Sequence, residues 1–100
     1  MQENYFNKEL INKIIDLAKQ FNVIKLIQFG SSLEHQLDCN DYDFACDGLN
    51  DKRFFRFGAS LESLLNKQVD LIPMQPRTPF IEYIEENGRV IYDAKNFSWN

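Results

Sequence analysis

Two aspartates separated by a single residue form the clearest chemical pattern in this sequence. Asp41 and Asp43 alternate with Tyr42 and Phe44, and residues two apart on an extended strand face the same side. Two carboxylates on one strand face repel each other unless a cation lies between them, and their hard oxygen atoms suit Mg²⁺. The pair therefore predicts a divalent-cation site of the kind that phosphoryl chemistry uses.

A third aspartate, Asp70, stands in the apolar run 69–72. A lone carboxylate buried among apolar side chains costs free energy unless it is paired or bound to a metal. We therefore expect Asp70 to be buried in a strand and to be held there for chemistry.

A glycine and two serines follow the apolar run 23–29, at Gly30, Ser31 and Ser32. A glycine lets a phosphate approach the main chain closely, and the first turn of a following helix offers N–H groups without helical partners. The serine hydroxyls can donate hydrogen bonds as well. This corner is expected to bind the phosphates of a nucleotide.

Alternating helices and strands are expected to position these residues. Helix starts are indicated by caps at Asn7, at Asn50 or Asp51, and at Thr78 before Pro79, each followed by apolar residues at helical spacing. The expected elements are a helix from the Asn7 cap to about residue 21, strand 23–29, a short helix or turn at 32–37, strand 40–46, helix 52–66, strand 69–74, helix 79–87 and strand 89–93. This order predicts an α/β (α+β) fold with a mixed four-stranded sheet and helices mainly on one face.

Two glycines are expected to have structural roles. Gly88 follows Asn87 and predicts the end of the last helix. Gly58 lies within helix 52–66, where a glycine costs about 1 kcal/mol relative to alanine. Its presence there indicates close packing on another element.

Composition limits the class of protein. The 100 residues, of which 44% are hydrophobic and 26% charged, predict a single domain over residues 1–100. No apolar run approaches the roughly 20 residues of a membrane span, and the start of the sequence lacks the apolar core of a signal peptide. We therefore expect a cytoplasmic protein without a membrane partner. The net charge of −4, from 15 acidic and 11 basic residues, argues against a nucleic-acid partner.

The cysteines and the histidine restrict the chemistry further. Cys39 and Cys46 have six residues between them, a spacing that matches no usual zinc or redox motif, and we expect both to be reduced thiols. His35 is the only histidine, which excludes a histidine-based triad and a multi-histidine metal site. Solvation of His35 and contact with a phosphate both stay open.

The motifs together resemble those of the minimal nucleotidyltransferases of the DNA polymerase beta type, which include the MntA-type antitoxins. Their pattern is a hydrophobic residue, Gly, and Gly or Ser, then after a short interval Asp, a hydrophobic residue, an acid and a hydrophobic residue. A third acid between hydrophobic residues follows later. The pattern is filled by Phe29-Gly30-Ser31, Asp41-Tyr42-Asp43-Phe44 and Val69-Asp70-Leu71.

This resemblance implies an activity and a partner. It implies that the catalytic and metal-binding residues are Asp41, Asp43 and Asp70, and that the nucleotide-binding residues are Gly30, Ser31 and Ser32. Two Mg²⁺ ions would be present when the substrate is bound, and AMP from ATP, or the monophosphate of another NTP, would be transferred to a hydroxyl. The resemblance also implies a small helical HEPN-type partner, with this chain as the antitoxin of a toxin–antitoxin pair. Formation of a homo-oligomer stays open.

Three other interpretations are considered. Segment 32–37 lacks the basic residue that many family members carry after Gly-Ser, so a catalytically weak module that neutralises a partner by complex formation stays open. Asp41 and Asp43 could instead be solvated at a strand edge, but Asp70 would then lack an explanation. A calcium-binding loop fits poorly, because Phe44 and its neighbours stand where an EF-hand needs oxygen ligands.

Overall fold

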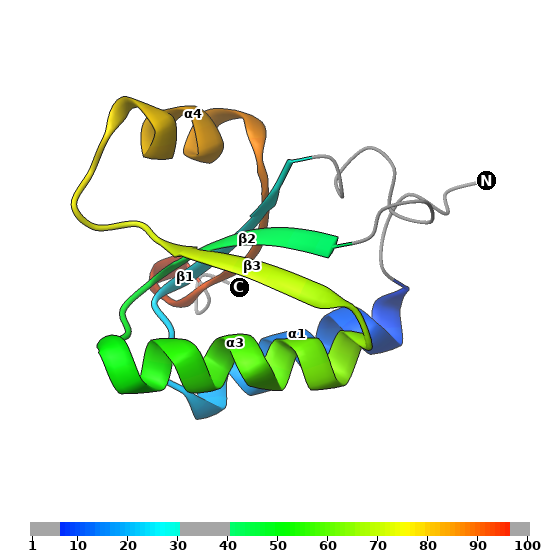
Figure 1. Ribbon diagram of the computed structural model, residues 1–100. Coiled ribbons are helices and arrows are strands. Elements are labelled where there is room, and N and C mark those ends of the chain that lie inside the picture. Colours follow the sequence, from blue (N-terminus) through cyan, green and yellow to red (C-terminus); the bar gives the residue numbers. More distant parts are fainter. Residues whose placement is uncertain (1–6, 31–40, 97–100) are drawn as a thin grey trace.

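Helices and strands alternate along the chain as the sequence predicts. The computed structural model describes residues 7–30 and 41–96. The elements are α1 (Lys8–Gln20), β1 (Lys25–Phe29), β2 (Asp41–Asp47), α3 (Asp51–Leu65), β3 (Gln68–Pro73), α4 (Pro79–Asn87), β4 (Arg89–Asp93) and the 3₁₀ turn η1 (Ala94–Asn96) (Figure 1). The predicted short helix or turn at 32–37 lies outside the described residues.

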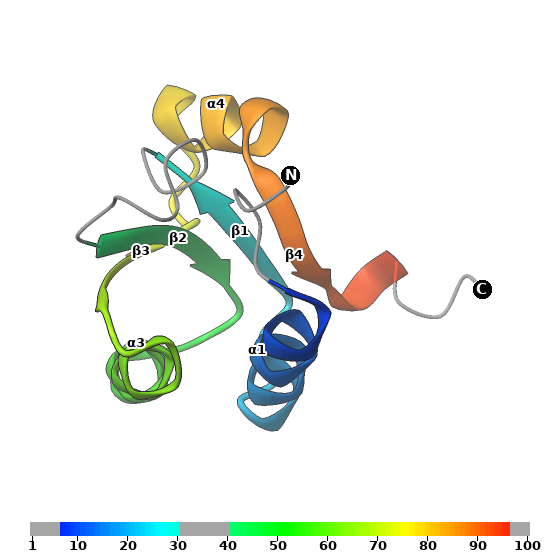
Figure 2. The ribbon, with the colours of Figure 1, turned by 90° about the vertical axis from the view of Figure 1, so that its right-hand side faces the viewer.

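The four strands within residues 7–30 and 41–96 form one mixed sheet in the order β3-β2-β1-β4. Strand β1 pairs antiparallel with both β2 and β4, whereas β2 and β3 run parallel. Helices α1 and α3 lie on one face of the sheet, and the shorter α4 lies on the other (Figures 1 and 2). The predicted mixed four-stranded sheet, with helices mainly on one face, is confirmed.

The larger core lies between the sheet and the helices α1 and α3. Alternate residues of β2 face it, because successive side chains of a strand point to opposite faces. Its buried members include Ile14, Leu26, Tyr42, Phe44, Cys46, Phe57 and Leu61. The side chains on this face of β2 are therefore buried in the core and unavailable to a ligand.

A smaller core lies beneath α4 on the opposite face. It joins side chains of the sheet to the apolar stripe of α4, through Ile27, Ala45, Met74, Ile81 and Ile84. Because α4 has only 9 residues, it covers part of this face. The uncovered part carries the acidic residues of β2 and β3.

Helices α1, α3 and α4 begin at the predicted caps. Asn7, Asn50 and Thr78 each accept a hydrogen bond through a side-chain oxygen from the backbone N–H three residues later. These bonds satisfy N–H groups that have no partner within the first helical turn. Within the described part of the chain, the helices are too short or too polar to cross a membrane.

The last helix ends at Asn87, as predicted, but not for the predicted reason. Gly88 has a φ of −81°, so it does not form a left-handed cap. A Cβ atom at Gly88 would lie 2.6 Å from Cγ2 of Ile27 and 2.8 Å from the carbonyl oxygen of Gln28. Close packing of the chain on β1 therefore explains this glycine.

The first strand begins two residues later than predicted. Val23 donates its backbone N–H to the carbonyl oxygen of Ala18 at 2.9 Å, and Asn22 has a φ of 62°. These residues turn the chain out of α1 and cannot extend the sheet. Regular pairing therefore begins at Lys25.

Candidate active site

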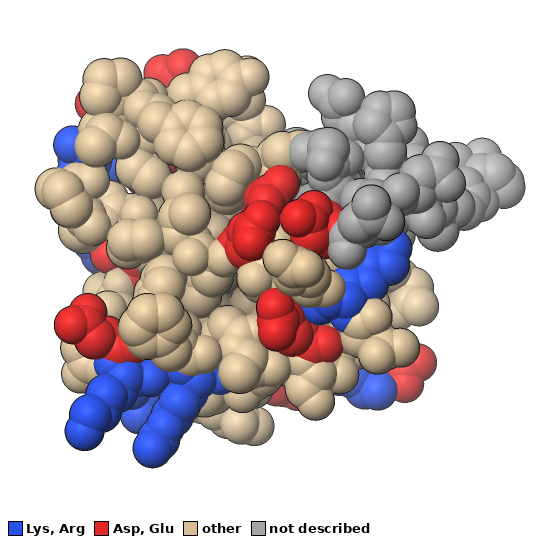
Figure 3. Space-filling model, in the orientation of Figure 1, with Lys and Arg blue, Asp and Glu red and all other residues tan. Residues whose placement is uncertain are grey.

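The structure brings the three predicted aspartates together. Asp41 and Asp43 lie on the face of β2 opposite the larger core, and Asp70 is the register partner of Asp43 on the parallel strand β3. One carboxylate oxygen of each aspartate lies within 4.8 Å of the others. Figure 3, in the orientation that views the sheet from its edge, shows acidic side chains gathered near the middle of the molecule.

The predicted burial of Asp70 is wrong, because its side chain is exposed. Strand β3 stands at the end of the sheet order, and α4 packs over other parts of this face. The apolar neighbours of Asp70 in the sequence alternate with it, and Val69 and Leu71 turn toward the larger core. The case for a role of Asp70 in chemistry therefore rests on its position beside Asp43.

The central carboxylate of the group has an altered acidity. Burial raises the pKa of Asp43 above its ordinary value, and the negative charges of Asp41 and Asp70 and a hydrogen bond with Asp70 raise it further. A divalent cation would remove this repulsion, and three carboxylates at these distances supply the hard oxygen ligands that Mg²⁺ prefers. The donor set therefore fits a magnesium site.

The predicted glycine corner borders this group directly. Gly30 directly follows β1 and has a φ of +79°, a left-handed conformation that residues other than glycine rarely adopt. A Cβ atom at this position would lie 2.3 Å from Oδ2 of Asp43. The backbone of Gly30 can lie against Asp43 only because it carries no side chain. The other predicted residues of this region lie outside the described residues, namely Ser31, Ser32, His35 and Cys39.

An aromatic pair borders the acids on the side of α4. Phe29 is the register partner of Asp43 on β1, and cross-strand partners on one face of a sheet lie in contact. The ring of Phe29 meets that of Phe80, on α4, edge to face, with 5.8 Å between centroids. The acidic group is thus bounded by aromatic side chains on one side and is exposed toward β3 at Asp70.

One basic residue that the sequence did not single out contacts β2 through Tyr42, on the face opposite the aspartates. Nζ of Lys67 lies 5.5 Å from the centre of the Tyr42 ring, between the two aspartates of β2 in the chain. Two other basic residues are engaged elsewhere. Arg53 donates a hydrogen bond to a backbone carbonyl oxygen at the end of α1, and Arg77 forms an ion pair with Glu85. Lys67 stands in the turn between α3 and β3, where no sequence motif distinguishes it.

The one cysteine in the described part of the chain is not a reactive group. Cys46 is a free thiol in the larger core. Burial and the nearby charge of Asp47 raise the pKa of Cys46 to about 12. The thiol is therefore protonated at neutral pH, and because Cys46 forms no disulfide it agrees with the prediction of a reduced thiol.

The fold and the site together define a class of enzyme. A mixed sheet with paired acids on one strand, a third acid on the parallel neighbour and a glycine corner at the end of the adjoining strand matches the nucleotidyltransferase pattern. The family model "Polymerase beta, Nucleotidyltransferase" matches residues 12–97. The chain belongs to this family, and the predicted resemblance is confirmed.

Solved structures agree with this fold. One is a toxin–antitoxin with AMP-PNP, with a TM-score of 0.69 and 21% identity, covering 87% of this chain and 76% of that chain. Another is a tri-AMPylated HEPN toxin from Shewanella oneidensis in complex with an MNT antitoxin, with a TM-score of 0.66 and 20% identity, covering 90% of this chain and 75% of that chain. A third is the toxin–antitoxin MntA–HepT, with a TM-score of 0.66 and 18% identity, covering 91% of this chain and 76% of that chain. At these identities the likeness shows the fold. No protein with a curated function matches the sequence significantly.

Proposed function

We propose that this chain is a Mg²⁺-dependent nucleotidyltransferase that transfers AMP from ATP to a hydroxyl group of a HEPN-type partner, as the antitoxin of a toxin–antitoxin pair. The observation that carries the proposal is the convergence of three carboxylates within 4.8 Å. Membership of the nucleotidyltransferase family supports the type of reaction. The similar structures that contain AMP-PNP and a tri-AMPylated HEPN toxin support the donor and the partner.

The proposed reaction is an in-line displacement at phosphorus. The oxygen of the acceptor hydroxyl forms a bond to the α-phosphorus of ATP, and the bond from this phosphorus to the bridging oxygen of pyrophosphate breaks. The hydroxyl proton passes to the carboxylate of Asp70, which is exposed and open to an incoming group. The backbone at Gly30, with the hydroxyls of Ser31 and Ser32, holds the β and γ phosphates.

Asp41, Asp43 and Asp70 would hold Mg²⁺, with two ions present when the substrate is bound. When bound, Mg²⁺ would neutralise charge that develops on the phosphate oxygens. The repulsion among the three carboxylates prepares the site for a cation, because the same repulsion that raises the pKa of Asp43 is relieved on binding. Gly30 allows the phosphates to approach Asp43 without a side chain between them.

The test is incubation with ATP, Mg²⁺ and a HEPN-type protein encoded beside this chain, followed by intact mass measurement of that protein. We expect a mass gain of one or more AMP units with the unsubstituted chain and none with Asp43→Asn. Asp16→Asn is the matched control, because Asp16 is an exposed aspartate on α1, on the opposite face of the sheet. A partner that gains no mass contradicts the proposal.

A binding module with weak catalysis is a second candidate, and one observation favours it. Arg53 and Arg77 are both engaged away from the acidic group, at the end of α1 and with Glu85. Fewer cations near the phosphates would weaken binding of ATP. A tight complex with the partner, formed without any gain of mass in the same experiment, identifies this function.

A further inference from the structure

A groove with a volume of about 370 Å³ runs along the molecule between α3 and the edge strand β3. Asp70 lines it, so the groove is continuous with the acidic group. The rings of Phe54 and Phe55 meet edge to face with 5.8 Å between centroids, and the small residues Gly58 and Ala59 lie beside them. The groove therefore has aromatic and small residues on its α3 side, has the acidic residues Glu62 and Asp70 in its lining, and borders the candidate active site at the edge of the sheet.

The edge of β3 is poorly suited to pairing with another strand. Met74 donates its N–H to the carbonyl oxygen of Cys46, which places the N–H groups of even-numbered residues toward β2 and those of odd-numbered residues outward. The outward N–H of Val69 already donates to Oε2 of Glu62 at 2.9 Å. Pro73, at another outward position, has no N–H. Side-chain contacts in the groove are thus favoured over addition of a strand.

The order of the strands sets the direction from which an acceptor arrives. The Gly30 corner lies at the end of β1, Asp43 lies on β2, and Asp70 lies on β3 at the edge. In an in-line displacement the acceptor stands opposite the leaving pyrophosphate. If the phosphates lie at the Gly30 corner, the acceptor enters across β3, where the groove opens.

We propose that this groove binds the acceptor-bearing segment of the partner protein. The segment would place an apolar side chain against Phe54 and Phe55, and its hydroxyl group would reach over the edge of β3 to Asp70 on the opposite face of the sheet. Glu62 and Asp70 are the charged residues of the lining, so a Lys or Arg near the hydroxyl is the complementary partner residue. This inference rests on the proposed function and adds to it the surface that selects the acceptor.

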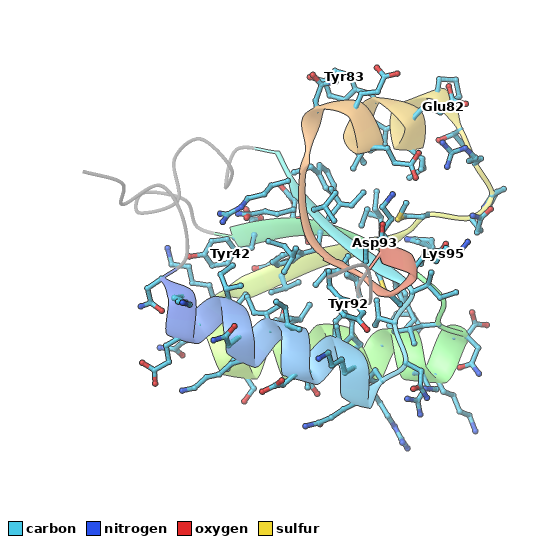
Figure 4. The ribbon with its side chains drawn as sticks, turned by 180° about the vertical axis from the view of Figure 1, so that it is seen from behind. Tyr42, Glu82, Tyr83, Tyr92, Asp93 and Lys95 are labelled. Carbon is cyan, nitrogen blue, oxygen red and sulfur yellow. The ribbon has the colours of Figure 1, made fainter. Side chains whose placement is uncertain are left out.

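Two substitutions test the groove without touching the aspartates. Ala59→Trp fills the groove at an exposed helical position, and Phe55→Ser removes an aromatic side chain that is 74% exposed. Tyr83→Ser is the matched control, because Tyr83 is 61% exposed and lies on the side of α4 that faces away from the sheet (Figure 4). The rate of AMP transfer is measured against the concentration of the helical partner, and the Kd for Mg-ATP is measured separately.

We expect both groove variants to raise the KM for the partner by about tenfold or more, which corresponds to about 1.4 kcal/mol. Their kcat and their Kd for Mg-ATP should stay within about twofold of the unsubstituted chain, as should every constant of Tyr83→Ser. Circular dichroism checks folding, and Phe55→Ser decides the matter if Ala59→Trp does not fold. An unchanged KM in a folded groove variant overturns the proposed role of the groove and leaves the proposed function standing. Absence of transfer by the unsubstituted chain overturns both.

Discussion

The two faces of the sheet differ in what they contribute to the molecule. On β2, Tyr42, Phe44 and Cys46 are buried beneath α1 and α3, whereas Asp41 and Asp43 face the opposite side and repel each other. One strand of 7 residues therefore supplies both the core and the candidate site. Strand alternation separates the side chains that stabilise the fold from those that would perform chemistry, so the two can be altered independently.

The largest effect on stability is expected on the packed face. Phe44 is fully buried, and Phe44→Ala should lower the free energy of unfolding by about 3–5 kcal/mol through lost contacts and a cavity. Urea denaturation measures the change. Phe55→Ala is the control, because an exposed aromatic should cost no more than about 0.5 kcal/mol. Similar losses in the two variants would contradict the assignment of the core to this face.

A smaller loss of stability is expected where the backbone meets the acids. Gly30→Ala would impose strain at a φ of +79° and would place Cβ 2.3 Å from Oδ2 of Asp43. Strain of this kind costs on the order of 1–3 kcal/mol. Movement of Asp43 away from the added Cβ atom would relieve this strain and should also weaken Mg²⁺ binding. Calorimetric titration measures the affinity for Mg²⁺. Unchanged stability together with unchanged Mg²⁺ affinity would show that Gly30 does not shape the site.

A gain is expected at the glycine of α3. The prediction that Gly58 packs closely on another element is only partly right, since a Cβ atom there would lie 3.6 Å from Cδ2 of Leu71, an ordinary contact distance. Gly58→Ala should therefore stabilise the protein by about 0.5–1 kcal/mol, because alanine loses less conformational entropy in a helix. Thermal unfolding measures the shift. A lower Tm would mean that the helix and β3 cannot accommodate a methyl group.

The smallest change in stability is expected at the charged face. The pKa of Asp43 is raised in the folded state above its ordinary value of 3.8, so the folded protein binds this proton more tightly than the unfolded chain does. Without a divalent cation, the stability of the folded protein should therefore fall as the pH rises from 3.8 through the higher pKa of Asp43 in the folded state. The ionised carboxylate should be unfavourable at neutral pH. Asp43→Asn should match or exceed the stability of the unsubstituted chain at pH 7.

Denaturation across pH 3 to 7 in the presence of a chelator checks this expectation. The difference between the unsubstituted chain and Asp43→Asn should grow toward pH 7. Addition of Mg²⁺ should then stabilise the unsubstituted chain and leave Asp43→Asn nearly unchanged. A variant that is clearly less stable than the unsubstituted chain without a cation would make Asp43 a structural residue.

Local sequence rules were sufficient for most elements and for the shared face of Asp41 and Asp43. The caps at Asn7, Asn50 and Thr78 are local hydrogen bonds, and the alternation of Asp41 and Asp43 with apolar residues needs only an extended strand. The limits of α4 and β4 also agree with the predicted 79–87 and 89–93. Such features depend on neighbours in the chain, which the sequence displays directly.

Features that depend on strand order could not be predicted. Asp70 is exposed because β3 lies at the edge of the sheet, and its apolar neighbours carry no information about that position. Gly88 is required by contact with β1, and Lys67 reaches Tyr42 from a turn. The groove likewise forms only when α3 packs beside β3. Each of these contacts joins residues whose proximity is set by the tertiary fold.

The central claim is that the acidic face is a magnesium and nucleotide site, and a crystal structure with Mg²⁺ and a nonhydrolysable ATP analogue tests it most directly. We expect Mg²⁺ at about 2.0–2.1 Å from carboxylate oxygens of Asp41 and Asp43. The β and γ phosphates should lie at the Gly30 corner, with the α-phosphate on the side toward Asp70. An analogue that binds elsewhere on the molecule, or binds here with no ion on Asp43, would contradict the account.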